Sequence, residues 1–292
     1  RERGQTMVIV AVLMVGLIGI LALVIDLGNV HAERRRMQNA ADAAALAGAR
    51  ALALEQGEDA ARAAAHDYAV TRNGAEVCVT TLTTPTVTVV VSRTVSTYFA
   101  SVIGIPTVPV PARATAGFGV PISWQGDLMP VAVHTSTLVL TGTFQIWDDD
   151  KTDTDLDGGM VADGQRGWLN FNGGGLSNAE LKDWVANGYD GPVSVGDWIN
   201  GDPGTRASAL DEMQKVREHT VIIVPIYDTT RPGVNGNGAL DYHVVAFAAL
   251  YVERVKDTGN PKLIEGHFVK YVSAQEWGPG PDTGVRVVRL IE

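Results

Sequence analysis

The sequence has little of the material from which catalytic and metal centres are usually built. It contains one cysteine, Cys78, so an internal disulfide is excluded, as is a zinc site built from clustered Cys and His. It has no G-x-S-x-G or H-E-x-x-H motif, and its glycine clusters lack the spacing of a phosphate-binding loop. His243 and His267 fall in strand-like stretches, which favours structural roles. The sequence therefore predicts no catalytic residue and no cofactor-binding residue.

Positive charge is also scarce. The chain has 23 Lys and Arg against 33 Asp and Glu, a formal net charge of −10. Residues 1–72 carry eight basic and eight acidic side chains, so the negative excess lies further along the chain. A nucleic acid or an anionic membrane surface would require clustered Lys and Arg. The composition therefore argues against both partners.

Charge is entirely missing from Met7 to Ile25, nineteen residues that read "MVIVAVLMVGLIGILALVI". As a helix this segment would span roughly 28 Å, close to the bilayer core of about 30 Å. A cleavable secretory signal is the alternative, but such signals have a shorter apolar region and end at a small-x-small site, which "LALVIDLG" lacks. A core helix of a soluble protein would show a polar stripe. The segment is predicted to be a retained membrane-spanning or filament-core helix.

Nothing in the sequence stops this helix after Ile25. The first proline is Pro85, and alanine, the best helix former, dominates residues 40–53. We expect one helix from about Gln5 to Gln56, roughly 75 Å long, and a second, shorter helix from Glu58. An alanine-rich helix lets neighbouring elements approach closely. A solvated linker helix is the alternative interpretation of this stretch.

Three blocks near the N-terminus resemble the TadE/TadG-like family of Flp (Tad) pilus-assembly proteins. They are "RGQ" at residues 3–5, "VIDLGNV" at residues 24–30 and "RRRMQNAADAAALAGA" at residues 34–49, with the apolar run between the first two. Residues 87–118 and parts of the C-terminal region are similar to the family more loosely. The resemblance implies a single membrane helix, a bulk of the chain outside the cytoplasm and a role in building or decorating a pilus. It implies no catalytic residues.

The rest of the chain is predicted to be rich in strands. Residues 77–118 indicate strand, strand, helix and strand, with Tyr98, Phe99, Val102 and Ile103 on one helical face and the proline-bearing last strand at a sheet edge. Beyond residue 121, four long strands and two helices are expected, one of which opens with a capping box of Ser177 and Glu180. The predicted fold is α+β: a long N-terminal hydrophobic helix on a small pilin-like sheet, then a β-rich outer domain. The expected regions are 1–72, 73–120 and 121–292.

An acidic stretch, "DDDKTDTDLDGG" at residues 148–159, is the sharpest chemical signal. Asp153, Asp155 and Asp157, followed by Gly158, match the beginning of a calcium-binding loop, because alternating carboxylates and a glycine turn suit Ca²⁺. The glutamate expected at the twelfth position is missing, since Gly164 stands there. Calcium binding and a solvated acidic turn are both consistent with this stretch.

The functional hypothesis is a non-enzymatic structural or assembly component of a Tad/Flp-type pilus in the cell envelope. Residues 5–56 are expected to contact the lipid bilayer, other pilus subunits or both, in a homo- or hetero-oligomer. The alternative is a membrane-tethered adhesin or ligand-binding module, and a third is an envelope hydrolase. Five tryptophans of the outer domain, expected to be core or loop anchors, would favour glycan binding only if they clustered at the surface beside the acidic loop. They are Trp147, Trp168, Trp184, Trp198 and Trp277.

Overall fold

Two compact units make up the chain in the computed structural model, which describes all residues except 1, 140–141, 149–167, 205, 234–238 and 292. The first unit holds residues 1–118 and 288–292, and the second holds residues 119–287. The first is a long helix on a small sheet, and the second is rich in strands. The predicted α+β fold is thereby confirmed.

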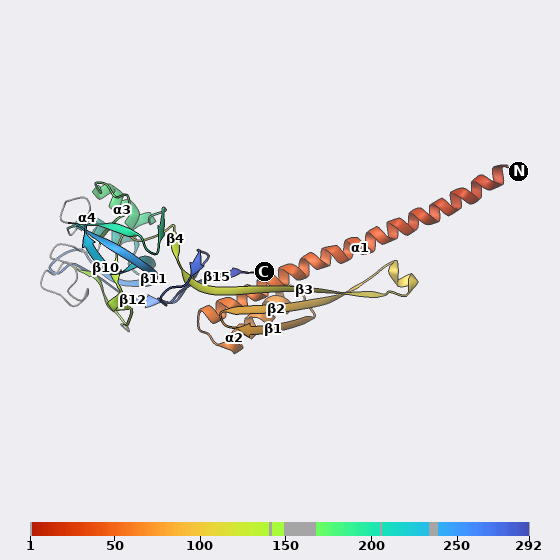
Figure 1. Cartoon of the computed structure of the whole chain (residues 1–292), viewed down its shortest axis with the longest axis horizontal. Helices are drawn as coiled ribbons and strands as arrows, with labels where there is room; N and C mark the ends of the chain where they lie inside the picture. The colour runs from red at the N-terminus through yellow and green to blue at the C-terminus, as the bar shows by residue number, and fades with distance from the viewer. Residues whose placement is uncertain (1, 140–141, 149–167, 205, 234–238, 292) are drawn as a thin grey trace. The chain divides into compact units, whose positions relative to one another are not determined.

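The first unit is built on a single unbroken helix, α1 (Glu2–Ala53), drawn in red and orange in Figure 1. It is continuous because no proline interrupts it and alanine fills its second half. Gly57 then serves as the N-cap of α2 (Glu58–His66) with a φ of 94°, a conformation that favours glycine. Glu58 and Arg62, four residues apart on α2, form an ion pair at 3.6 Å. A π-helical segment, η1 (Asp67–Arg72), extends α2.

The sheet of the first unit is an antiparallel meander of β1 (Val77–Thr83), β2 (Thr86–Ser96) and β3 (Thr107–Pro121). Alternate residues of β2, among them Val87, Val89 and Val91, are fully buried, as strand periodicity requires. They share one core with small residues of the second half of α1, namely Ala40, Ala41, Ala44, Ala45 and Ala49. The expected helix on a small sheet is therefore what forms.

Two details of the predicted first unit were wrong. Strand β3 lies between β2 and β15 (Val285–Leu290) rather than at an edge, and Ile291 N–H donates to Thr115 O at 2.8 Å. A proline removes only its own N–H donor, so the rest of β3 still pairs. The helix expected over residues 96–104 is a single 3₁₀ turn, η2 (Ala100–Ile103), which ends at Gly104 with a φ of 89°. Gly104 in the left-handed region and Pro106 two residues later end the turn before a longer helix can form.

The second unit is organised around the long central strand β11 (Leu240–Lys256), which pairs antiparallel with β10 (Val221–Pro232) and β12 (Leu263–Val269). The strand order is β5-β10-β11-β12-β6, with β9 also paired to β11 and β7 paired to β9. The additional strands are β5 (Val133–His134), β6 (Phe144–Asp148), β7 (Trp168–Asn170) and β9 (Trp198–Asp202). Three of the four long strands expected beyond residue 121 are β10, β11 and β12 of this sheet, and the fourth forms as β15 but pairs with β3.

Both faces of β11 are buried, which explains its uninterrupted apolar run "VVAFAALYV". Ala246, Ala248 and Leu250 belong to a core that also contains residues of α3 (Asn178–Asn187) and α4 (Ala207–Val216). Val244 and Phe247 belong to a second core with Trp124 and Ile199. The sheet thus carries a core on each side.

The predicted capping box at the start of α3 is present. Ser177 precedes the helix in an extended conformation, and its Oγ accepts a hydrogen bond from Glu180 N–H at 3.1 Å. Gly188 ends α3 with a φ of 79°. The remaining short elements of this unit are β4 (Ser123–Gln125), η3 (Thr135–Val139), β8 (Pro192–Ser194), β13 (Tyr271–Ser273) and β14 (Trp277–Gly278).

Candidate functional site

The N-terminal part of α1 has almost no cover from the rest of the chain. Its large apolar side chains over residues 7–25 are between 50% and 79% exposed, and among these nineteen residues only Ala22 is buried. The helix is long and apolar enough to cross a membrane. Exposed apolar surface of this extent is unfavourable in water, so the segment requires lipid or other protein chains around it.

The second part of the same helix is covered on one side by the sheet. From Met37 onward, residues that face β2 and β3 are fully buried. Gln38 Nε2 donates to Arg113 O at 3.1 Å, and Glu33 lies 3.5 Å from Arg93. The border between the uncovered and the packed parts of α1 therefore lies between residues 26 and 37.

A buried carboxylate, Asp26, marks the beginning of this border. Its side chain is 7% exposed and accepts hydrogen bonds from three successive backbone N–H groups: Tyr98 at 2.7 Å, Phe99 at 3.0 Å and Ala100 at 2.7 Å. The charge that ends the apolar run is thus satisfied inside the protein, as a buried charge must be. Asp26 directly follows the apolar run in the sequence, and no partner was predicted for it. An isolated acid directly after a membrane-length segment is the signal that a donor group should have been sought.

Exposed arginines follow the apolar segment. Arg34, Arg35 and Arg36 are all exposed, and they lie about 13 Å or more along the helix axis beyond Ile25. They are placed to meet water or headgroups beyond the end of an inserted segment.

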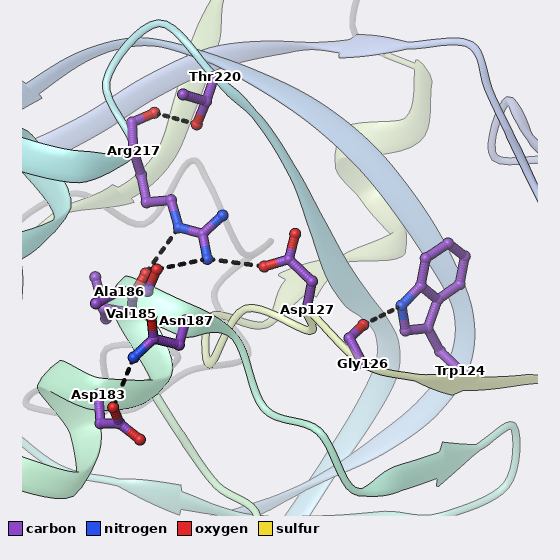
Figure 2. Close-up of polar contacts among 9 residues, drawn as sticks. All are labelled: Trp124, Gly126, Asp127, Asp183, Val185, Ala186, Asn187, Arg217 and Thr220. Carbon is purple, nitrogen blue, oxygen red and sulfur yellow. Dashed lines mark hydrogen bonds and ion pairs between the residues drawn. The ribbon is translucent and has the colours of Figure 1, made fainter.

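In the second unit, one well-connected charged side chain, Arg217, has a structural role. Figure 2 shows Arg217, whose Nε donates to Val185 O at 2.8 Å and whose Nη2 donates to Ala186 O at 3.1 Å and to Asp127 at 2.8 Å. The two carbonyls belong to the last turn of α3 and have no partner within the helix, so the guanidinium caps that end. This arrangement fixes α3 in place and does not resemble a reactive centre.

A cavity of about 310 Å³ lies between β7, β9 and the end of β10. Asp241 on its wall is 2% exposed and accepts from Asn200 Nδ2 at 3.0 Å and from Arg231 Nε at 3.2 Å. The Arg231 guanidinium also lies 4.1 Å from the centroid of the Trp198 ring. Further aromatic lining comes from Phe171 and Tyr189, whose rings stack at 4.3 Å. Flat apolar rings beside fixed amide and carboxylate groups suit a polar ligand with apolar faces.

The residues predicted for calcium, Asp153, Asp155 and Asp157, lie outside the described residues. Calcium binding at that loop therefore stays a prediction. Within the part of the chain that the structure describes, no group of three or more His, Cys, Asp or Glu side chains is arranged to hold a metal ion.

The other singled-out residues have mostly structural positions. Trp147, Trp168 and Trp184 are buried in the core, whereas Trp198 is 37% exposed at the cavity. The two histidines expected to be structural are both paired: His243 Nδ1 lies 2.8 Å from Asp228, and His267 Nδ1 lies 2.8 Å from Glu253. Cys78 is a half-buried free thiol in β1, and burial raises its pKa.

Comparison with known proteins adds one finding. Residues 4–51 match the family described as putative Flp pilus-assembly TadE/G-like. No curated protein and no solved structure matches the chain. The matched segment contains the apolar run, Asp26, the arginines and the alanine-rich block, so the resemblance inferred from these residues is confirmed. A TadE/G-like segment that includes a long apolar helix fits a pilus-associated, membrane-anchored protein.

Proposed function

We propose that this chain is a non-enzymatic component of a Tad/Flp-type pilus, held by residues 7–25 in the membrane or in the core of the filament. Its second unit then lies outside the cytoplasm, and neighbouring pilus subunits are its partners. The supporting observation is that one helix is uncovered over a membrane-length apolar segment and packed on its own sheet over the remainder. The match over residues 4–51 supports the pilus assignment.

The apolar segment has enough side chains to make insertion favourable. Thirteen of its nineteen residues are Val, Ile or Leu. At about −0.3 to −0.6 kcal/mol for each such residue, their sum is on the order of −4 to −8 kcal/mol. Burial against sister subunits would remove the same surface from water. An isolated chain in aqueous buffer has neither environment and is expected to aggregate.

A charge at the centre of the segment tests the proposal. Leu17→Arg should raise the free energy of insertion by about 3–4 kcal/mol, a change of more than 100-fold in the partition equilibrium. His31→Arg is a matched control, because His31 is an exposed residue of the same helix beyond the apolar segment. The measurements are the fraction of protein that stays with membranes after alkaline washing and the yield of sheared filaments that contain the chain.

The expected result is loss of membrane and filament association for Leu17→Arg and retention for His31→Arg. Equal retention of both variants, or a detergent-free full-length chain that stays monomeric, would contradict the proposal.

The cavity of the second unit favours a second candidate function, a surface adhesin or ligand-binding module tethered by α1. The partly exposed ring of Trp198 and the amide of Asn200, which both line the cavity, are suited to a saccharide, whose ring packs against an aromatic side chain while its hydroxyls bond to amides. Trp198→Ala in the full chain should then abolish binding on a glycan array and leave pilus assembly intact. If the chain has only a structural role, neither the unaltered chain nor the Trp198→Ala variant should bind glycans.

A further inference from the structure

The connection between β2 and β3 has an unusual surface for a loop between two strands. Residues 98–105 read "YFASVIGI", and none of them is charged. Their large apolar side chains are exposed: Val102 by 85%, Ile103 by 78%, Tyr98 by 67%, Ile105 by 48% and Phe99 by 42%. We refer to residues 98–105 as the apolar loop. Loop tips in water normally carry polar residues, so this surface indicates an apolar environment.

The opposite turn of the same sheet shows the contrast. The β1–β2 turn consists of Thr83, Thr84 and Pro85, which are exposed and small or polar. The chain around the apolar loop has no charged residue between Arg93 and Arg113. Residues 77–92, around the opposite turn, are uncharged as well, so the two turns differ in polarity and not in charge. Of these two turns, only the β2–β3 connection exposes large apolar side chains.

The apolar loop is fixed beside the last turn of the apolar segment of α1. Asp26 accepts the N–H groups of Tyr98, Phe99 and Ala100, and Asn29 Nδ2 donates to Ser96 O at 3.5 Å. Ala22 lies one helical turn before Asp26 on the same face of α1, and it is only 8% exposed. Its neighbours Leu21 and Leu23 are both more than 60% exposed. In Figure 1 the loop, drawn in yellow, follows α1 toward its N-terminus beyond the paired part of the sheet.

We propose that the apolar loop is a second membrane-contacting element, which inserts into the interface of the bilayer beside α1. This inference rests on the proposed membrane anchor. If residues 7–25 span the hydrocarbon core, Asp26 lies at its outer edge, and the loop that is bonded to Asp26 lies at the same depth. The loop and the helix then meet lipid as one continuous apolar surface.

Lipid fits this surface better than a protein partner does, for two reasons. The exposed side chains continue the surface of the segment that the proposed anchor places in lipid, and the ring of Tyr98 suits the headgroup level, where one end is apolar and the other wet. The charge of Asp26 is satisfied by backbone donors, so the loop brings no free charge into the interface. A zwitterionic bilayer should be sufficient, since no basic residue belongs to the apolar loop.

The test places an environment-sensitive fluorophore on single cysteines of the full chain, in a Cys78→Ser background, reconstituted alone in phosphatidylcholine vesicles. The probe positions are Val102→Cys in the apolar loop, Thr84→Cys in the opposite turn and Leu17→Cys in the apolar helix. Lipids that carry a spin label near the headgroup quench probes at the interface, lipids that carry one near the end of the acyl chain quench probes at the bilayer centre, and aqueous iodide quenches probes in water.

We expect the Val102 probe to be blue-shifted and to lose most of its emission to the shallow spin label, while the Thr84 probe responds only to iodide. A Val102 probe that responds to iodide as Thr84 does, while Leu17 is quenched by lipid, overturns the inference and leaves the membrane anchor standing. Protection of Val102 only after other pilus proteins are added also overturns it, in favour of a subunit contact. A Leu17 probe that reports water shows instead that the anchor itself, and with it this inference, is wrong.

Discussion

Helix α1 approaches β2 and α2 closely at Gly48, because glycine has no side chain there. A Cβ added there would lie 3.0 Å from Val87 Cγ1, 3.3 Å from Ala61 O and 3.6 Å from Ala65 Cβ. The two closest distances are tighter than ordinary contact, and one of the neighbours is a backbone oxygen that cannot change rotamer. Any larger side chain must push the helix away from β2 and α2.

Gly48→Leu should therefore destabilise the first unit by about 1–3 kcal/mol, the usual range for overpacking, and the better helix propensity of leucine offsets less than about 1 kcal/mol of this. Gly28→Leu is the matched control, because an added Cβ at Gly28 meets nothing within 4 Å. That variant should gain the helix propensity without any clash.

Amide hydrogen exchange of the full chain in detergent micelles measures the difference locally. Gly48→Leu should speed exchange of the amides of β2 and of α1 residues 40–53 by roughly 5- to 150-fold, the factor that corresponds to 1–3 kcal/mol. Exchange in Gly28→Leu should be unchanged or slower. If the two variants exchange alike, α1 does not pack on the sheet as described here.

Three other predictions concern separate parts of the chain. Asp26→Ala should speed hydrogen exchange at the amides of residues 98–100, because their acceptor is lost. Asp26→Asn should speed this exchange less, because one side-chain oxygen remains as an acceptor. Unchanged exchange in the alanine variant would contradict the three hydrogen bonds to Asp26. Hydrogen bonds from Thr143 and then His267 hold the pKa of Glu253 below its ordinary value of 4.5. Folding thus favours the ionised form, so this contribution to stability is present above pH 4.5 and is lost as the pH falls through the lower folded pKa. Glu253→Gln should flatten the acid side of the profile of unfolding free energy against pH, measured by chemical unfolding. An identical profile for the variant would refute the assignment. If Asp153, Asp155 and Asp157 bind calcium, EDTA should lower the melting temperature of the second unit and Ca²⁺ should restore it. At 100-fold saturation, calcium should add about 2.7 kcal/mol to the free energy of unfolding. No shift of the melting temperature in either direction would reject calcium binding.

The sequence by itself determined the elements that are stabilised by residues close together in the chain. The absence of proline and the run of alanines were sufficient for the continuous α1, and the Ser177–Glu180 spacing was sufficient for the beginning of α3. Nineteen uncharged residues identified the segment that needs lipid or sister chains. In each case the deciding interactions lie within a few residues along the chain.

Tertiary structure alone decided the features that join distant residues. Asp26 and the amides of residues 98–100 are more than seventy positions apart, and their contact follows from how the β2–β3 meander is placed on α1. The pairing of β15 with β3, and the meeting of Trp198, Arg231 and Asp241 at one cavity, likewise depend on contacts between strands far apart in sequence. A pattern of hydrophobic residues specifies which face of a strand is buried, but it does not specify which strand lies beside it.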